Sequence, residues 1–436
     1  MRVSTNTVFN SGVNSINEQM AALVHMNRQV ALGRRIVTPS DDPVAAARAL
    51  EVTQARDVSN QFAKTQDAAK SALSLEEGHM SSVTDLLGRL RELAVQGANG
   101  TLAEGDRKAI TAELRARYEE LIGIANSRDG SGRYVFSGYM GDTVPFSGNV
   151  EAGVSYAGDS GQRRLQLAPT RFLEISDSGY DVFQNIRNGN GYFATGLGTY
   201  TGTAIIDGGS VTNPVAWNAN VPTSGLKIQF WQDSTGTRNV PVGSMPGKTF
   251  YEIVDAAGDS VFTGIPPDPL NPFSFTHEYQ EGVAIPLVGQ GNVDLGAHVL
   301  VSGSPATGDE FTINPSTSQS LFATLGNLIT DLESPAGSTS DKAKLANNVG
   351  FALTNLSQAE ENILRVRAQI GTRMNEVDSL SSMTQDLNIQ YQQTLSDLQD
   401  LDYAKTLSDL TRKQTDLEAA QKSFVAISKL SLFNYI

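Results

Sequence analysis

The chain of 436 residues contains no cysteine. This excludes disulfides and thiol catalysis, and it removes the thiolate ligands of structural zinc. No apolar run approaches twenty residues, so the sequence indicates no membrane span and no membrane insertion. Residues 1–10 lack the apolar segment of a cleaved secretory signal. A cysteine-free chain also suits export in an unfolded state, although many cytosolic proteins share this composition.

Motifs for catalysis or ligand binding are also missing. The histidines are far apart in the sequence and none has a metal-ligand spacing: His25, His79, His277 and His298. The glycine-rich run at residues 189–202 lacks the spacing of a phosphate-binding loop and is interpreted as an ordinary loop. We therefore expect no catalytic, cofactor-binding or metal-ligating residue, and no enzymatic activity.

Proline is nearly missing from both ends of the chain. Of sixteen prolines, only Pro39, Pro43 and Pro335 lie outside the stretch from Pro145 to Pro315. Because proline breaks helix interiors, both ends are free to form long helices. Apolar residues recur there in steps of three and four, as they do in coiled coils. One such stripe runs from Val58 through Leu87 to Ala94, and another from Leu345 through Leu387 to Leu401.

The fold class predicted from this pattern is α+β, with long N- and C-terminal helices paired as a coiled-coil bundle and a mainly-β central domain inserted between them. Stripes near the termini are weakened by polar residues such as Asn27 and Gln414. We interpret these terminal stripes as the surface through which subunits assemble. The candidate interface residues are Val13, Ile16, Met20, Leu23, Val30, Leu407, Leu410, Leu417, Phe424 and Ile427.

Two adjacent aspartates precede the second helical stripe. Asp41 and Asp42 could form an acid/base pair, but Asp42 followed by Pro43 matches a capping aspartate and a first-turn proline. This interpretation explains both aspartates without an acid/base role. We therefore predict a helix-opening turn that contains Pro39, Asp42 and Pro43.

The acidic charge is concentrated in the middle of the chain. The net charge of the whole chain is −14, and residues 141–340 hold 7 Lys and Arg against 19 Asp and Glu. The ends are nearly neutral and can pack closely against other copies. No basic stripe is present to neutralise phosphates, so the charge pattern argues against nucleic acid as a partner.

The middle also carries short alternating runs separated by glycine, proline, asparagine and aspartate. Both tryptophans, Trp217 and Trp231, fall here, and we favour core anchors over a sugar-binding platform. A helix is predicted at residues 320–333. Strands are predicted at residues 133–137, 164–167, 172–175, 226–231, 249–254, 283–288, 299–301 and 310–313.

These patterns divide the chain into three predicted regions. Residues 1–43 plus 402–436 form a terminal coiled-coil domain. Residues 44–140 plus 336–401 form a helical rod domain with a β-hairpin at residues 132–139. Residues 141–335 form a mainly-β outer domain.

Four separated motifs carry a family resemblance: Arg-Val-Ser-Thr at residues 2–5, Gly-Arg-Arg-Ile-Val-Thr-Pro-Ser-Asp-Asp-Pro at 33–43, Gly-Arg-Tyr-Val-Phe-Ser-Gly-Tyr at 132–139, and Ser-Leu-Phe-Asn-Tyr-Ile at 431–436. Together with Pro145 and Phe146, they resemble the hook-associated junction proteins of the bacterial flagellum, a family within the flagellin superfamily. Residues 190–304 resemble no family and are assigned by position alone.

The resemblance implies a structural junction protein that connects a hook-side junction protein to the flagellin filament by helix-mediated self-assembly. It implies an extracellular location on the flagellum and type III export without a cleaved signal peptide. The implied partners are other copies in a ring, the hook-side junction protein, flagellin and a cytoplasmic export chaperone. Two alternatives remain: filament flagellin, against which residues 35–40 argue, and a surface adhesin displayed by the β domain.

Overall fold

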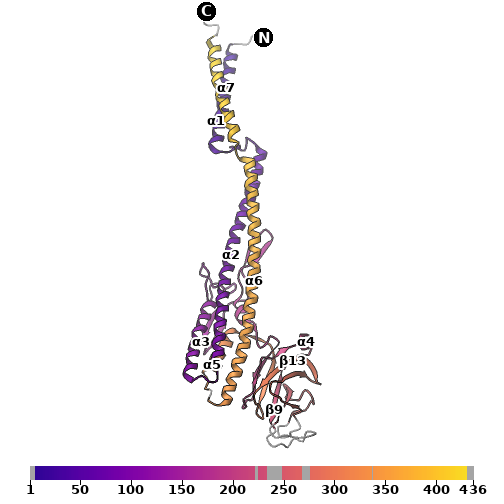
Figure 1. Ribbon diagram of the computed structural model, residues 1–436. Coiled ribbons are helices and arrows are strands. Elements are labelled where there is room, and N and C mark those ends of the chain that lie inside the picture. The colour runs from indigo at the N-terminus through magenta and orange to yellow at the C-terminus, as the bar shows by residue number, and fades with distance from the viewer. Residues whose placement is uncertain (1–4, 221–223, 233–247, 268–274, 336, 430–436) are drawn as a thin grey trace, which may run out of the picture. The chain divides into compact units, whose positions relative to one another are not determined.

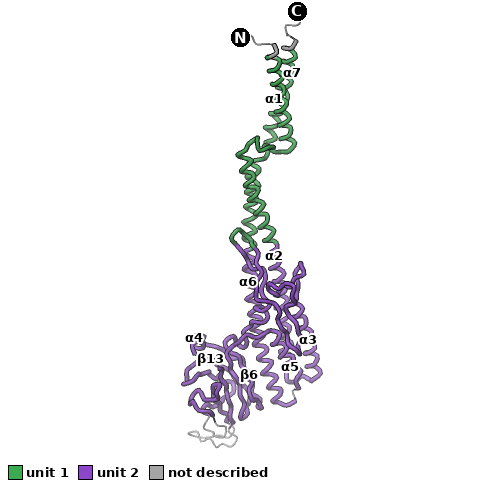
Figure 2. Tube along the Cα trace, turned by 180° about the vertical axis from the view of Figure 1, so that it is seen from behind, with its two compact units in different colours: residues 1–67, 166–170, 377–436 green, residues 68–165, 171–376 purple. Residues whose placement is uncertain are grey.

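The computed structural model describes residues 5–220, 224–232, 248–267, 275–335 and 337–429. The chain divides into two compact units (Figure 2). Unit 1 contains residues 1–67, 166–170 and 377–436, and unit 2 contains residues 68–165 and 171–376. The three regions predicted from the sequence do not coincide with these units. Two of the predicted boundaries fall inside unit 1 and two inside unit 2, so the three-region division stays a prediction.

Long helices open and close the chain (Figure 1), which confirms the predicted fold class. They form where proline is missing, and α2 begins at Pro43, a position that proline tolerates. Two of them, α2 and α6, contribute residues to both units. The helices are α1 (Thr5–Leu32), α2 (Pro43–Gly97), α3 (Glu104–Ala125), α4 (Pro214–Asn220), α5 (Leu321–Glu333), α6 (Thr339–Gln399) and α7 (Tyr403–Lys429), with a short π-helix η1 (Tyr180–Gln184).

Within unit 2 the predicted stripes of α2 and α6 are buried. The α2 stripe contributes Met80, Leu87 and Leu90, and the α6 stripe contributes Val349 and Ile363. Each of these side chains is at most 2% exposed. Burial of one such side chain contributes about 1.5 to 3 kcal/mol, so this seam is a main source of stability in unit 2.

An aromatic cluster extends the helical core of unit 2. Phe146, Phe183 and Phe322 lie with ring centroids 5.1 to 6.0 Å apart. Tyr118 of α3 packs edge-on against Phe322 of α5, at 6.0 Å. The cluster connects α3 and α5 with η1, which contains Phe183, and with the segment that begins at Phe146.

The inserted β region of unit 2 has two main antiparallel sheets. One has five strands in the order β11-β10-β9-β14-β6, and the other has four in the order β12-β13-β7, with β8 also paired to β13. Three smaller sheets pair β1 with β2, β3 with β4, and β5 with β15. The strands are β1 (Phe146–Asn149), β2 (Gly153–Tyr156), β3 (Arg164–Ala168), β4 (Arg171–Glu174), β5 (Ile186–Arg187), β6 (Phe193–Leu197), β7 (Ile205–Ile206), β8 (Ser210–Val211), β9 (Leu226–Gln232), β10 (Thr249–Asp255), β11 (His277–Glu278), β12 (Ala284–Gly289), β13 (Val293–Ser302), β14 (Glu310–Pro315) and β15 (Ser318–Gln319).

One apolar core fills the space between the two main sheets. It includes Phe230, Ile253, Leu287 and Phe311, none more than 1% exposed. Trp217 belongs to this core, and Trp231 packs against Phe250 and Phe275 in a smaller cluster. Both tryptophans are therefore core anchors, as predicted.

The predicted hairpin at residues 132–139 is wrong. Tyr134, Val135 and Phe136 are all buried, but no strand forms there, and Tyr134 makes only an isolated β-bridge to Arg128. Their backbone groups bond to different segments: Tyr134 N donates to Gly141 O, and Val135 N to Ser127 O. The chain then turns at Gly138, whose φ of +70° suits glycine. The first hairpin lies further on, between β1 and β2.

Candidate assembly surface

Helices α1 and α7 pair along their length within unit 1 (Figure 2). The Phe9 and Phe424 rings meet with centroids 5.1 Å apart. Gly12 makes room for this contact, because a Cβ added there would lie 2.7 Å from the Phe424 ring. The first and last helices therefore pack against each other inside a single subunit.

Most of the predicted interface residues take part in this internal packing. Leu410 is buried, at 8% exposed, whereas Met20 and Leu407 are 47% and 57% exposed. The side chain of Ile427, in α7, lies outside the described part of the chain. The remaining predicted residues are half-buried: Val13, Ile16, Leu23, Val30, Leu417 and Phe424. Their role in contacts between subunits stays a proposal.

The turn between α1 and α2 also holds the end of α6. Arg35 N donates to Gln399 O at 2.7 Å, and the Arg35 guanidinium donates to Leu398 O at 2.8 Å. These carbonyls end a helix and have no partner further along it. Gly33, with φ +68°, passes against the Tyr403 hydroxyl, which would lie 2.7 Å from an added Cβ. This close approach explains glycine at residue 33.

Asp41 stabilises the turn from inside. Its carboxylate accepts hydrogen bonds from the backbone amides of Val37 and Thr38, at 2.9 and 2.8 Å. Asp41 N in turn donates to Thr38 O at 3.0 Å, which places Pro39 second in a β-turn, where its fixed φ is favoured. The hydrogen bond from Thr38 N is the main reason that the pKa of Asp41 lies below its ordinary value.

Asp42 lies at the start of α2. Its Oδ1 accepts a hydrogen bond from Ala45 N at 3.0 Å, and its Oδ2 lies 3.2 Å from Arg35 Nη1. The amide of Ala45, followed by Arg35, holds the pKa of Asp42 below its ordinary value. This geometry is that of a capping aspartate, because it satisfies an amide of the first helical turn.

Replacing Asp42 with alanine is expected to destabilise this helix start by about 0.5 to 2 kcal/mol, because it leaves first-turn amides without an acceptor. Thermal or urea unfolding of the full chain measures the effect. Asp57→Ala is the matched control, since Asp57 lies in the interior of the same helix and is exposed. Equal stability of the Asp42 variant and the parent would contradict the capping role.

The parts of α2 and α6 that lie in unit 1 reverse the burial pattern seen in unit 2, where large apolar side chains are buried. Apart from Val377, where α6 enters unit 1, their buried side chains are small or polar: Ala45, Ala49, Ser59 and Gln66 on α2, and Thr384 on α6. Gln66 Nε2 donates to Thr384 Oγ1 at 3.0 Å and to Leu167 O at 2.8 Å. Asn388 Nδ2 donates to Asn60 Oδ1 at 3.1 Å. The seam between these helices therefore uses polar contacts and close backbone approach.

Some large apolar side chains of these segments, such as Phe62 and Leu380, are half-buried, but six others point outward. They are 38% to 65% exposed: Val44, Leu50, Val58, Met383, Leu387 and Ile389. The heptad spacing had placed Val58 and Leu387 on the buried seam, and the structure corrects this. The reason is that the small and hydrogen-bonding side chains occupy the seam and displace them. We call these six residues the outward face of unit 1.

The heptad spacing in the sequence did not predict this outward face. Isolated exposed apolar residues are normal on protein surfaces. Here, however, they accompany a polar seam, so the segment presents its apolar side chains to the outside. The signal available in the sequence was the small and polar residues at seam positions, above all Ala45, Ala49 and Gln66.

Metal-ligand groups and membrane-crossing helices are two further features that could indicate a function. No group of three or more potential metal ligands occurs among the described residues. Within the described residues, no helix is long and apolar enough to cross a membrane. Terminal helices that pair, with a β region inserted between them, are the architecture of flagellin-like structural proteins.

Comparison with known proteins agrees with this class. The family model for the bacterial flagellin N-terminal helical region matches residues 3–140. Flagellar hook-associated protein 3 of Escherichia coli (strain K12) is 25% identical over 99% of both chains. A flagellin of Shigella flexneri is 23% identical over 58% of this chain and 42% of its own. The match to flagellin is thus partial, and filament flagellin is not the favoured identity.

Similarity to solved structures identifies the family of the chain. The crystal structure of flagellar hook associated protein-3 from Legionella pneumophila is 31% identical, with a TM-score of 0.68, and covers 80% of this chain and 98% of that chain. FlgL of Xanthomonas campestris is 26% identical, with a TM-score of 0.65, over 79% of this chain and 99% of that chain. The chain belongs to the family of flagellar hook-associated protein 3, the flagellar junction protein FlgL.

Proposed function

We propose that the chain is the structural junction between hook and filament of a bacterial flagellum, and that it self-assembles through unit 1. The outward face of unit 1 is the observation that carries this proposal. Six large apolar side chains stand in water above a small and polar seam. Burying each in a subunit contact would contribute about 1.5 to 3 kcal/mol at most. Several together can outweigh the entropy cost of association.

The proposed partners follow from family membership. They are further copies of the chain in a ring, a hook-side junction protein, flagellin and a cytoplasmic export chaperone. The proposed location is extracellular, on the flagellum, after export without a cleaved signal peptide. The terminal residues Met20 and Leu407 remain candidates for contacts between copies because they are exposed beside the α1–α7 seam. The proposal assigns no catalytic role to any residue.

The outward face makes a direct test possible. Leu50→Asp and Ile389→Asp replace side chains that are 61% and 65% exposed. In the free subunit they cost little, whereas in an assembled contact each buries a carboxylate without a partner, at a cost of about 2 kcal/mol or more. We expect cells that carry only the double variant to form at most about a tenth of the normal number of filaments. Electron microscopy counts the filaments.

The matched control is the pair Val215→Asp and Ile265→Asp in unit 2. These side chains are 79% and 66% exposed, so the chemistry and the exposure are alike. Normal filament numbers are expected for the control. Circular dichroism of both purified proteins checks that they fold. Filament growth that is normal with the Leu50 and Ile389 variant, or equally reduced with the control, would contradict the proposed surface.

An adhesin displayed by the β domain is the alternative of a different class. A sugar platform on the tryptophans would require exposed rings, but Trp217 and Trp231 are 3% and 8% exposed. No specific observation on the two main sheets favours this alternative over the junction role.

A further inference from the structure

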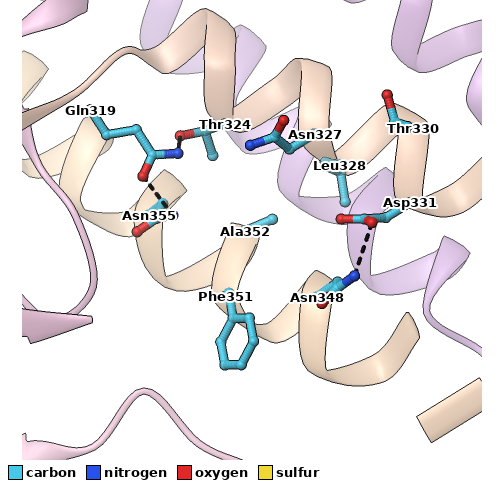
Figure 3. A pocket seen from close by; sticks show the side chains of 10 residues that line it. All are labelled: Gln319, Thr324, Asn327, Leu328, Thr330, Asp331, Asn348, Phe351, Ala352 and Asn355. Carbon is cyan, nitrogen blue, oxygen red and sulfur yellow. Dashed lines mark hydrogen bonds between the residues drawn. The ribbon is translucent and has the colours of Figure 1, made fainter. Parts of the chain in front are cut away.

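A pocket of about 280 Å³ lies between α5 and α6 in unit 2 (Figure 3). Positions three and four apart along each helix face the same side, so each helix contributes one stripe. The α5 stripe is Thr324, Asn327, Leu328 and Asp331, and the α6 stripe is Asn348, Phe351, Ala352 and Asn355. Both stripes lie in a part of the molecule that the assembly proposal does not use.

Hydrogen bonds fix the two ends of this pocket. At one end Asn348 Nδ2 donates to Asp331 Oδ1 at 2.9 Å. At the other end Gln319 Nε2 donates to Thr324 Oγ1 at 3.0 Å, and Asn355 Nδ2 lies 3.4 Å from Gln319 Oε1 (Figure 3). The polar groups at both ends are therefore held in place before any ligand arrives, which lowers the entropy cost of binding.

The middle of the pocket is amphipathic. Leu328 and Ala352 face each other between the helices and are 0% and 6% exposed (Figure 3). Asn327 is exposed above them and presents an amide that can both donate and accept. Seven of the ten lining residues carry polar side chains, so a ligand would contact mainly amide, hydroxyl and carboxyl groups.

The charge of the lining selects a neutral ligand. Asp331 is the only ionisable residue among the ten described residues that line the pocket, and none of the ten is Lys, Arg or His. Nothing in the lining would neutralise an anion, and only one carboxylate is present to balance the charge of a divalent cation. Burial raises the pKa of Asp331, which indicates a site that disfavours net charge.

We propose that this pocket binds a neutral sugar of about monosaccharide size. Amide and hydroxyl side chains that both donate and accept match sugar hydroxyls, which do the same. A peptide fits less well, because Leu328 and Ala352 are buried and offer its apolar side chains little contact. The inference goes beyond the junction role and does not depend on it.

The test uses saturation-transfer NMR and calorimetry on the full chain with a panel of neutral monosaccharides: D-glucose, D-galactose, L-rhamnose and N-acetyl-D-glucosamine. We expect at least one to bind with a Kd of about 1 to 10 mM, typical of a ligand this small. Asn327→Ala should weaken it by about fivefold or more, the effect of one lost hydrogen bond. Asn327 is exposed, so the variant should fold.

Asn375→Ala is the matched control, because Asn375 is an exposed amide on α6 outside the pocket. It should leave the Kd unchanged. The proposal is overturned if none of the four sugars binds at 50 mM, a level about five times the weakest Kd expected. It is equally overturned if Asn327→Ala and Asn375→Ala bind alike, or if only a blocked dipeptide amide, tested in parallel, competes for the pocket.

Discussion

Replacing Glu76 with glutamine is expected to abolish a loss of stability that the parent chain shows as pH rises from about 4.5 to about 8. Glu76 lies on the buried α2 stripe and is 0% exposed. Its Oε1 accepts a hydrogen bond from Asp177 N at 2.8 Å. Its Oε2 is buried and has no hydrogen-bond partner among the described residues.

The surroundings explain why this carboxyl group keeps its proton. Burial first, and then the negative charge of Asp177, raise the pKa of Glu76 to about 8. Arg373 and Arg163 lower it, but Arg373 is engaged by Asp177 in two hydrogen bonds of 2.9 and 3.1 Å. The proton is expected on Oε2, since Oε1 already accepts from an amide. Glutamine would place its uncharged Nε2 at that position.

The direction of the pH effect follows from linkage. Between its ordinary value of 4.5 and about 8, the folded state holds a proton on Glu76 that the unfolded state has released. The contribution of Glu76 to the free energy of unfolding is therefore largest below about pH 4.5. It falls as the pH rises towards about 8 and is constant above that. The loss is expected to be a few kcal/mol, because each unit of pKa shift corresponds to about 1.4 kcal/mol.

Urea unfolding of the full chain at pH 5, 7 and 9 measures this, because these values extend from near the ordinary pKa of 4.5 to above the folded-state pKa of about 8. The Glu76→Gln variant should match the parent at the lowest pH and exceed it by about 2 to 5 kcal/mol at the highest. Glu51→Gln is the control, since Glu51 is exposed on the same helix. Identical pH slopes for parent and Glu76 variant would exclude a protonated Glu76 in the folded protein.

Glu76 shows how far a heptad pattern can predict a structure. Steps of three and four residues from Val58 pass through Glu76 on the α2 stripe, and the structure buries it there. What makes it unusual is Asp177, about a hundred residues further along, and Arg373, which lies on another helix. Contacts so distant in sequence are set by tertiary packing. A single sequence provides no pattern from which they can be predicted.

The proposed assembly surface could be predicted only in part, again because packing decides what is buried. Heptad spacing correctly predicted that the terminal helices pair, because a long apolar stripe needs a partner. It did not predict that small and polar residues would occupy the seam near Ala49 and Gln66 and leave Leu50 and Ile389 outside. When a helix carries apolar residues on two faces, the sequence alone does not show which face is buried. Packing against neighbouring elements decides this.

The β region follows the same division between local and distant information. Strands such as β9 and β10 were predicted near their observed bounds, because alternation and turn residues are local signals. The order β11-β10-β9-β14-β6 could not be predicted, since it places β14 beside β9 across a long stretch of sequence. The wrong hairpin near Tyr134 arose because three consecutive buried side chains look like a strand in composition.

Hydrogen exchange in the isolated subunit is expected to differ by about a thousandfold or more between α7 and the unit 2 part of α6. Among the described side chains of α1 and α7, Leu410 is the only buried apolar one. In contrast, Ile363, Val366 and Ile370 of α6 are at most 2% exposed. Local opening costs little where few apolar contacts are lost, and it approaches the global stability where the core must open.

Mass spectrometry of the purified subunit should therefore show fast exchange at Leu407, Leu417 and Phe424 and slow exchange at Ile363 and Val366. In assembled junctions, both sets should exchange slowly, because neighbouring copies would cover the half-buried α1–α7 pair. Ordering such a segment on binding costs about 2 to 5 kcal/mol, which would restrain premature polymerisation and leave α7 accessible to a chaperone. Slow exchange at Leu407 and Leu417 in the isolated subunit would show instead that the pair is already stable before assembly, and restraint of polymerisation would then need another cause.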